Sequence, residues 1–185
     1  MSDIASKVLL APAASQLPVS WYFDEKVFDL EQRLIFDAGP GYVGHELMVP
    51  EVGSYRSLEW LDHSRLLIRN ADGYHQMSNI CRHRQAIMLQ GSGRTDHIVC
   101  PIHRWTYDQQ GKLLGAPHFD QNPCLNLRRQ PLENWHGLLF KGPRSANADL
   151  ADMRVAQELD FSGYKLEHVE IHECKYNWKT FIEVY

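Results

Sequence analysis

Between Asp24 and Phe36 the apolar residues recur at close to helical spacing, at Val27, Phe28, Leu30, Leu34 and Ile35. Asp24 stands where a carboxylate side chain can cap the first turn. The pattern therefore predicts a helix over 24–36, which Gly39, Pro40, Gly41 and Gly44 then break. The first twenty residues contain Pro12, Pro18 and small side chains, which is typical of a loose arm.

From Tyr42 to about Phe140 the pattern changes to short runs of branched and aromatic residues. These runs are Ser57–Trp60, Arg65–Ile68, Gln76–Ile80, Ile98–Cys100 and Gly137–Phe140. Turn signals separate them, namely Asn70–Gly73, Gly91–Gly93 and Asp108–Gly111. The rhythm predicts a mainly β fold, a small antiparallel sandwich or partly open barrel.

From residue 142 onward the sequence predicts a connecting segment, then a strand and then a helix. Residues 142–162 are polar and predict a connection, Tyr164–Cys174 has a partial period of two that predicts a strand, and a helix is expected from Tyr176 onward. The sequence stops at Tyr185 within an apolar run. A helix that opens with an apolar face needs more chain to pack against it, so we expect a fragment.

Composition narrows the classes of partner. The chain has 185 residues, 44% of them hydrophobic, and a formal net charge of −4, so no global basic field favours nucleic acid or anionic lipid. No apolar run approaches the roughly 18 residues of a membrane span. Val8–Ala14 is short and contains Pro12, which makes a poor signal peptide. We expect a cytoplasmic chain, with no nucleic acid and no membrane among its partners.

The cysteines and histidines carry the candidate chemistry. Cys81 and His83 form one close pair, Cys100 and His103 form another, and residues 84–99 separate them. Two thiolates and two imidazoles make a set of ligands for a transition-metal centre. Zinc accepts such a set, but zinc fingers usually place both cysteines in one pair and both histidines in the other. One cysteine and one histidine in each pair suits a two-iron cluster, with one iron bound by thiolates and the other by imidazoles.

Around these ligands the sequence resembles the Rieske iron–sulfur proteins, and in particular the ring-hydroxylating oxygenase α subunits. The resemblance is carried by Asn79–Arg84, by Cys100–Asp108 with Gly111–Leu113, by the stretch that includes Tyr42–His45, and by Asn177–Glu183 with its Asn-Trp-Lys motif. It implies a [2Fe-2S] cluster, with Cys81 and Cys100 on the inner iron and His83 and His103 on the outer one. The mononuclear Fe(II) of the family is expected only in a longer chain.

The resemblance also implies an organisation and a reaction. We expect an N-terminal arm and helix over 1–40, a Rieske [2Fe-2S] domain over 41–142, and over 143–185 a linker with the truncated start of an α+β catalytic domain. The family passes electrons from an NAD(P)H-dependent flavin reductase, in some cases through a ferredoxin, to the mononuclear iron, for O₂-dependent hydroxylation of an aromatic or related organic substrate. A full-length member is expected to form a homotrimer. Two alternatives stay open: a stand-alone Rieske-type ferredoxin and a structural zinc protein.

The loops around the ligands differ from other Rieske loops at positions that bear on the reduction potential and on the loop backbone. Ala86, Ile102 and Trp105 stand where respiratory Rieske proteins carry a disulfide and a serine, so we expect a potential at the low end of the roughly −150 to +300 mV Rieske range. Gln85 and Arg104 stand where glycine is common, which bears on the loop backbone if those positions need positive φ.

Several other residues have more than one reading. Arg82, Arg84, Arg94 and Arg104 either dock an acidic donor and stabilise the reduced cluster, or are solvated loop charges. Trp105 and Tyr107 are expected to pack beneath the cluster loop. His168 and His172 are interpreted as strand histidines, and Cys124 and Cys174 as buried thiols.

Overall fold

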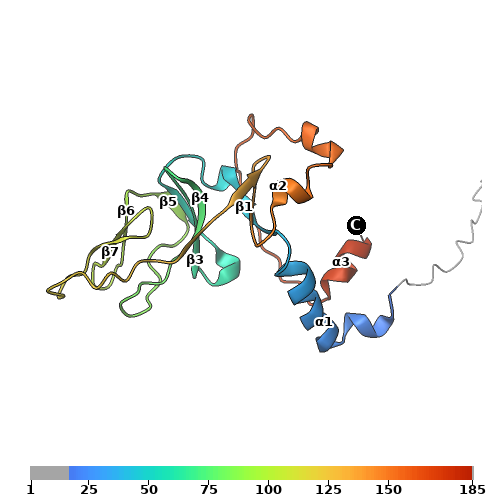
Figure 1. Cartoon of the computed structure of the whole chain (residues 1–185), viewed down its shortest axis with the longest axis horizontal. Helices are drawn as coiled ribbons and strands as arrows, with labels where there is room; N and C mark the ends of the chain where they lie inside the picture. Colours follow the sequence, from blue (N-terminus) through green and yellow to red (C-terminus); the bar gives the residue numbers. More distant parts are fainter. Residues whose placement is uncertain (1–16, 185) are drawn as a thin grey trace, which may run out of the picture.

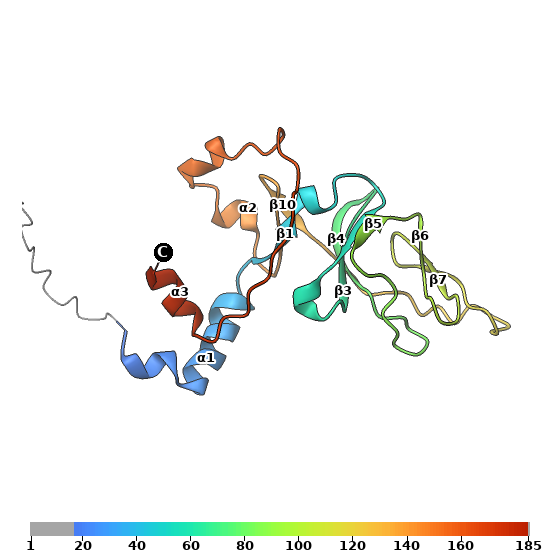
Figure 2. The same cartoon turned by 180° about the vertical axis from the view of Figure 1, so that it is seen from behind.

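The computed structural model describes residues 17–184, and most of the predicted N-terminal arm, residues 1–16, lies outside them. Figures 1 and 2 show an elongated molecule, with strands β6 and β7 towards one end, helices α1 and α3 at the other, and the remaining sheets between them. Among the described residues, no helix combines the length and the apolar character that crossing a membrane requires.

The predicted N-terminal helix is confirmed. A 3-10 turn at Val19–Tyr22 precedes helix α1 (Glu25–Glu31), which continues as a π-helical turn over Gln32–Phe36. The Asp24 side chain accepts the backbone N–H of Lys26 at 2.8 Å, so it caps the helix as expected. A Cβ at Gly39 would stand 2.8 Å from the carbonyl oxygen of Ile35, which explains the glycine just beyond the last turn. Gly41 and Gly44, predicted to break the helix, lie beyond its end and within a strand.

The central sheet has five antiparallel strands in the order β5-β2-β3-β4-β9. They are β2 (Ser54–Ser57), β3 (Arg65–Asn70), β4 (Gly73–Ser78), β5 (Ser92–Arg94) and β9 (Arg129–Pro131). The turn predicted at Asn70–Gly73 joins β3 to β4, and the Asn70 side chain accepts the N–H of Asp72 at 2.9 Å.

Two details of this sheet differ from the sequence prediction. The run Ser57–Trp60 is not one strand, because β2 ends at Ser57 and a 3-10 turn occupies Glu59–Leu61 after the fully buried Leu58. Gly91–Gly93 is not a turn, since Ser92 and Gly93 belong to β5. A Cβ at Gly93 would lie 3.0 Å from the hydroxyl of Tyr55, so the glycine makes room for that ring.

A second sheet carries the strands β6 (His97–Val99), β7 (Thr106–Asp108) and β8 (Leu113–Gly115). The predicted turn after Asp108 is confirmed, because the Asp108 carboxylate accepts the N–H groups of Gln110 and Lys112 at 2.9 and 2.8 Å. One hydrophobic core joins this sheet to the central one. Its fully buried side chains include Leu66, Ile68, Met77, Ile98, Trp105 and Tyr107.

The third sheet has the order β1-β11-β10, with β1 (Gly41–His45), β10 (Glu133–Trp135) and β11 (Leu138–Lys141). A second core lies between it and the central sheet, formed by Val43, Val49, Leu58, Leu67 and Leu139. A 3-10 turn at Glu46–Met48 follows β1. The three antiparallel sheets confirm the mainly β prediction.

Beyond β11 the chain is mostly irregular. The predicted connection contains helix α2 (Ala146–Asp149), capped by the Ser145 hydroxyl, and a 3-10 turn at Arg154–Glu158. The strand predicted over Tyr164–Cys174 is wrong, because no described strand pairs with this exposed segment and a strand needs a ladder partner. Helix α3 (Trp178–Val184) confirms the predicted C-terminal helix and lies beside α1 in both views.

A buried ion pair holds α3 against α1. The Lys179 ammonium lies 2.7 and 2.9 Å from the two carboxylate oxygens of Glu31, and the Trp178 indole N–H donates to the same carboxylate at 2.9 Å. The Lys179 side chain is only 5% exposed and that of Glu31 11%. The hydrogen bond from Lys179 is the main cause that lowers the pKa of Glu31 below its ordinary range.

Candidate metal centre

Two loops of matching shape carry the predicted ligands. In the first, the N–H of Cys81 donates to the carbonyl of Ala86 at 2.8 Å, and the N–H of Gln85 donates back to Cys81 at 3.0 Å. In the second, the N–H of Cys100 donates to Trp105 at 2.8 Å, and that of Arg104 donates back to Cys100 at 3.1 Å. Each loop thus begins with its cysteine and folds back over it.

The matching shape includes the backbone conformation. Gln85 and Arg104 occupy equivalent places and have φ values of 57° and 60°. Both positions thus have positive φ, and here residues with side chains adopt it. A left-handed conformation without glycine costs on the order of 1 kcal/mol, which the loop hydrogen bonds offset.

Asn79 fixes the first loop at its base. Its side chain is fully buried, donates to the carbonyls of His63 and Leu89 at 2.7 and 2.6 Å, and accepts the N–H of Leu89 at 2.9 Å. A bridge between Ile80 and Ile87 closes the loop above it. The asparagine that opens the first motif therefore positions Cys81 without contacting a ligand.

The two cysteines lie together inside the core. Cys81 is 1% exposed and Cys100 2%. Burial is the main cause that raises the pKa of the Cys81 thiol, and the neighbouring Cys100 side chain raises it further, whereas hydrogen bonds from the His83 backbone and the Tyr107 hydroxyl lower it. A pair of buried thiols that face each other is suited to a cation, which would hold both as thiolates.

The two histidines lie together nearer the surface. The rings of His83 and His103 are 4.7 Å apart between centroids and inclined by 75°. The Nδ1 atom of His83 is buried and has no hydrogen-bond partner within residues 17–184, so it is available as a ligand. Desolvation, followed by the charges of His103 and Arg84, lowers the pKa of His83 and favours the neutral ring that binds metals.

Aromatic side chains support the two loops from below. Trp105 and Tyr107 are fully buried, as expected, and the Trp105 ring stacks on His83 at 5.0 Å with an interplanar angle of 5°. The Tyr107 hydroxyl lies 3.8 Å from the Cys81 sulfur and accepts the N–H of Arg82 at 3.2 Å. Burial is the main cause that raises the pKa of Tyr107, so it stays a neutral hydroxyl.

Phe119 completes this aromatic support and was missed by the sequence analysis. Its ring meets Trp105 edge-on at 5.2 Å and His83 at 5.9 Å. Phe119 lies in an irregular stretch well beyond the second loop, and no periodicity or spacing in the sequence pointed to it.

The four donors are arranged as two pairs. A zinc ion would draw all four side chains to one point. The donors instead form a buried sulfur pair and a more accessible nitrogen pair. That division fits a two-iron cluster with one iron at each pair.

The loop arginines differ in their surroundings. Arg94 forms an ion pair with Glu51 at 2.8 Å, so its charge is already engaged. Arg82, Arg84 and Arg104 are exposed, and none of them has an acidic partner among residues 17–184.

The remaining candidates lie away from the two loops. Cys124 and Cys174 are exposed, so the expectation of buried thiols is wrong: both lie in irregular segments with no core around them. His168 and His172 lie on either side of Glu170 in the unpaired segment, at 3.9 and 3.3 Å from its carboxylate. They are surface histidines and not strand histidines.

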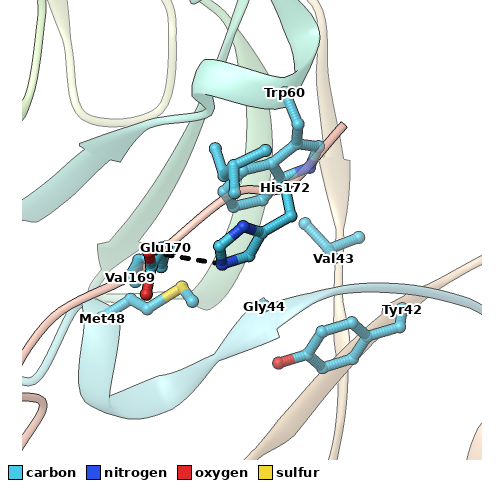
Figure 3. Close-up of a pocket in the computed structure, with 9 residues that line it drawn as sticks. Tyr42, Val43, Gly44, Met48, Trp60, Val169, Glu170 and His172 are labelled. Atoms are coloured by element: carbon cyan, nitrogen blue, oxygen red, sulfur yellow. Dashed lines mark ion pairs between the residues drawn. The ribbon is translucent and has the colours of Figure 1, made fainter. Parts of the chain in front are cut away.

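This segment borders an open pocket of about 470 Å³ over β1. Figure 3 shows Tyr42, Val43, Met48, Trp60 and His172 around it, with the ion pair between Glu170 and His172 at its edge. None of the four predicted ligands lines this pocket, so it is separate from the metal centre.

Comparison with known proteins identifies relatives of this chain. Residues 41–132 match the model of the Rieske [2Fe-2S] domain. Putrescine 2-hydroxylase of Ralstonia nicotianae is 58% identical over 185 residues, which cover all of this chain and 51% of that protein. The glycine betaine monooxygenase oxygenase subunit of Chromohalobacter salexigens is 37% identical over 179 residues, which cover 90% of this chain and 40% of that subunit.

The fold has solved counterparts as well. A crystal structure of the quaternary ammonium Rieske monooxygenase CntA superimposes with a TM-score of 0.71 at 23% identity, covering 90% of this chain and 51% of that one. The chain spans about half the length of the curated relatives just described, or less. Both relatives are oxygenases that match it across most or all of its residues. The chain therefore belongs to the Rieske oxygenases and carries their Rieske [2Fe-2S] domain.

Proposed function

We propose that this chain is the electron-transferring part of a Rieske oxygenase. It takes electrons one at a time from a protein donor and passes them to a mononuclear iron that residues outside this chain hold. The observation that carries the proposal is the convergence of two matching loops, which pair Cys81 with Cys100 and His83 with His103.

Cys81 and Cys100 would hold one iron as thiolates, and His83 and His103 would hold the other through neutral imidazoles. When bound, a [2Fe-2S] cluster supplies a centre that stores and releases one electron. The buried cysteines keep water from the sulfur side, and the half-exposed histidines give the site its accessible edge.

The surrounding residues set the conditions for this transfer. Tyr107 points its hydroxyl at the Cys81 sulfur, where a donated hydrogen bond stabilises added negative charge. Trp105 and Phe119 pack against His83, which fixes the ring and excludes water from one face. The exposed Arg82, Arg84 and Arg104 add positive charge around the loops.

The relatives indicate the substrate class. One is named for putrescine and the other for glycine betaine, which are both small aliphatic nitrogen compounds. We infer hydroxylation of such an aliphatic amine rather than of an aromatic ring. By the same reasoning the partners are an NAD(P)H-dependent flavin reductase, with or without a ferredoxin, the assembly is a homotrimer, and the compartment is the cytoplasm.

A stand-alone ferredoxin is less consistent with the molecule. An electron carrier needs little beyond the sheets around the cluster, whereas this chain also builds α1 and α3 and joins them through the Glu31–Lys179 pair. The match to putrescine 2-hydroxylase also extends through these helices, because it covers the whole chain.

The experiment uses the protein at the length at which its native host makes it. Mixed with NADH, a flavin reductase and putrescine, it should consume O₂ and form hydroxylated putrescine. The Cys100→Ser variant should lose this activity by at least a hundredfold, while Cys124→Ser, which alters an exposed thiol, retains it. Putrescine-independent O₂ uptake, or full activity in Cys100→Ser, would contradict the proposal.

A further inference from the structure

Two adjoining hollows lie beside the first cysteine loop, where β4 meets β9. The first has a volume of about 270 Å³ and is lined by Ser78, Ile80, Cys81, Arg82, Gln85 and Arg128. The second, of about 210 Å³, shares Ser78 and Arg128 and adds Arg65, Gln76, Arg129 and Gln130. We call the two together the arginine trough.

The pairing of the strands creates the trough. Met77 pairs with Arg129 and Gln76 with Gln130, and the N–H of Ser78 donates to the carbonyl of Arg128 at 2.8 Å. Arg128 therefore stands at the end of this ladder, directly before β9 and next to the start of the first ligand loop.

The charge of the trough has one sign. Four arginines line it and no aspartate or glutamate does. Arg129 is compensated by Asp72 at 2.9 Å, but Arg65, Arg82 and Arg128 have no acidic partner within residues 17–184. Because the whole chain carries a formal charge of −4, this positive field is local and distinguishes one face of the molecule.

The trough also reaches the metal centre. Cys81 lines the first hollow, and Arg82 follows it in the loop. A partner seated here would lie beside the loop that carries Cys81, a residue proposed to hold the cluster. The open pocket over β1 lacks both features, since it contains none of the predicted ligands and includes the acidic Glu170.

We infer that the arginine trough is the docking site for a carboxylate-bearing surface of the protein that delivers electrons to this chain. The inference rests on the proposed function and adds the place of entry and the chemistry of the partner. Arginine forks bind carboxylates bidentately, and charge complementarity orients an encounter more than it tightens it. In the docked pair, one electron leaves the reduced donor, which becomes oxidised, and enters this chain's centre, which becomes reduced.

A binding experiment tests the trough without requiring electron transfer. The probe is a fluorescent hexaglutamate peptide, followed by anisotropy on the 185-residue chain at about 10 mM salt, where charges are weakly screened. Arg128→Glu should weaken binding about tenfold, the size expected when one exposed charge is reversed. Arg128→Lys should retain most of it. Arg154→Glu makes the same charge change at an exposed residue outside both hollows and should leave binding as it is.

A kinetic experiment then tests delivery. With the cluster loaded, a reduced acidic [2Fe-2S] ferredoxin should reduce Arg128→Glu about tenfold more slowly than wild type, and the difference should vanish at about 1 M salt. Reduction by dithionite alone should be equal in both. Equal peptide binding and equal ferredoxin rates in Arg128→Glu and Arg154→Glu would overturn the inference, as would inorganic phosphate displacing the peptide at equal concentration, which indicates a site for small anions.

Different results would overturn the proposed function and the docking inference. If the wild-type chain binds no iron and sulfide, the proposed function fails and the peptide experiment still reports on the trough. If the cluster forms and accepts electrons from dithionite but Arg128→Glu changes nothing, only the docking inference fails.

Discussion

At the residue scale, the chain contains its own controls for the predicted ligands. Cys81 and Cys100 are buried and paired, whereas Cys124 and Cys174 are exposed and lie apart from them. Changing a cysteine to serine alters one atom and leaves the volume nearly unchanged, so only the position differs between variants.

We predict that Cys81→Ser and Cys100→Ser each lose more than nine tenths of the bound iron, because an iron with a single thiolate from the protein is poorly held. Cys124→Ser and Cys174→Ser should retain wild-type iron. Iron and sulfide analysis after reconstitution measures this. Equal loss in all four variants would mean that the cluster does not depend on the paired thiols.

Tyr107 carries a second prediction at this scale. Tyr107→Phe removes the hydroxyl that reaches the Cys81 sulfur and accepts the N–H of Arg82, so it should cost about 1 kcal/mol of stability. It should also lower the reduction potential, because the reduced cluster loses a donor to sulfur. Redox titration followed by visible absorption measures the shift, with Tyr55→Phe on β2 as the control. A raised or unchanged potential would show that the hydroxyl does not act on the cluster.

At the scale of elements, the helices depend on side chains far apart in sequence. Each of α1 and α3 spans seven residues, and helices this short are marginal in water by themselves. Glu31, Lys179 and Trp178 join them with charge-assisted hydrogen bonds shielded from solvent.

We predict that Glu31→Gln makes local unfolding of α1 and α3 easier, lowering its free energy by about 3 kcal/mol. The reason is that the buried Lys179 side chain loses its carboxylate partner. The double variant Glu31→Gln with Lys179→Met should recover part of this loss. Amide hydrogen exchange measures it, with the amides of β3 as the internal reference. Faster exchange throughout the sheets as well would contradict a local role for the pair.

His75 on strand β4 makes the stability of the fold depend on pH. Burial is the main cause that lowers the pKa of His75 below its ordinary value of 6.5, and the positive charge of Arg129 adds to it. The unfolded chain therefore binds a proton at His75 at a pH where the folded chain does not, so stability is present above about pH 6.5 and falls below it.

His75→Gln should flatten the fall in unfolding free energy between pH 7 and 5, measured by urea denaturation at each pH. A residual slope is expected, because burial also lowers the pKa of His45. An unchanged slope in the variant would mean that His75 does not contribute to the pH dependence of the unfolding free energy.

At the scale of the whole molecule, the sequence predicted those features that depend only on residues close together in the chain. The Asp24 cap, the Asn70–Gly73 turn and the two ligand pairs are each set by a few adjacent residues. The buried residues of β3 follow from its apolar run Leu66, Leu67 and Ile68.

The features that the sequence did not predict correctly depend on residues far apart in the chain. Tyr164–Cys174 has a strand-like pattern, but a strand forms only where another offers its hydrogen bonds, and none of the described strands does so. Phe119, the Glu31–Lys179 pair and the arginine trough join residues from separate segments. The periodicity of a single segment cannot indicate contacts with residues of another segment.

Electron–nuclear double resonance tests whether two histidines bind the cluster. It is applied to the reduced chain, loaded with iron and sulfide and grown with ¹⁵N-labelled histidine. We predict couplings from two histidine nitrogens, one of which disappears in His83→Cys and the other in His103→Cys. A signal with no histidine coupling, or a colourless chain that binds one zinc ion, would contradict this prediction.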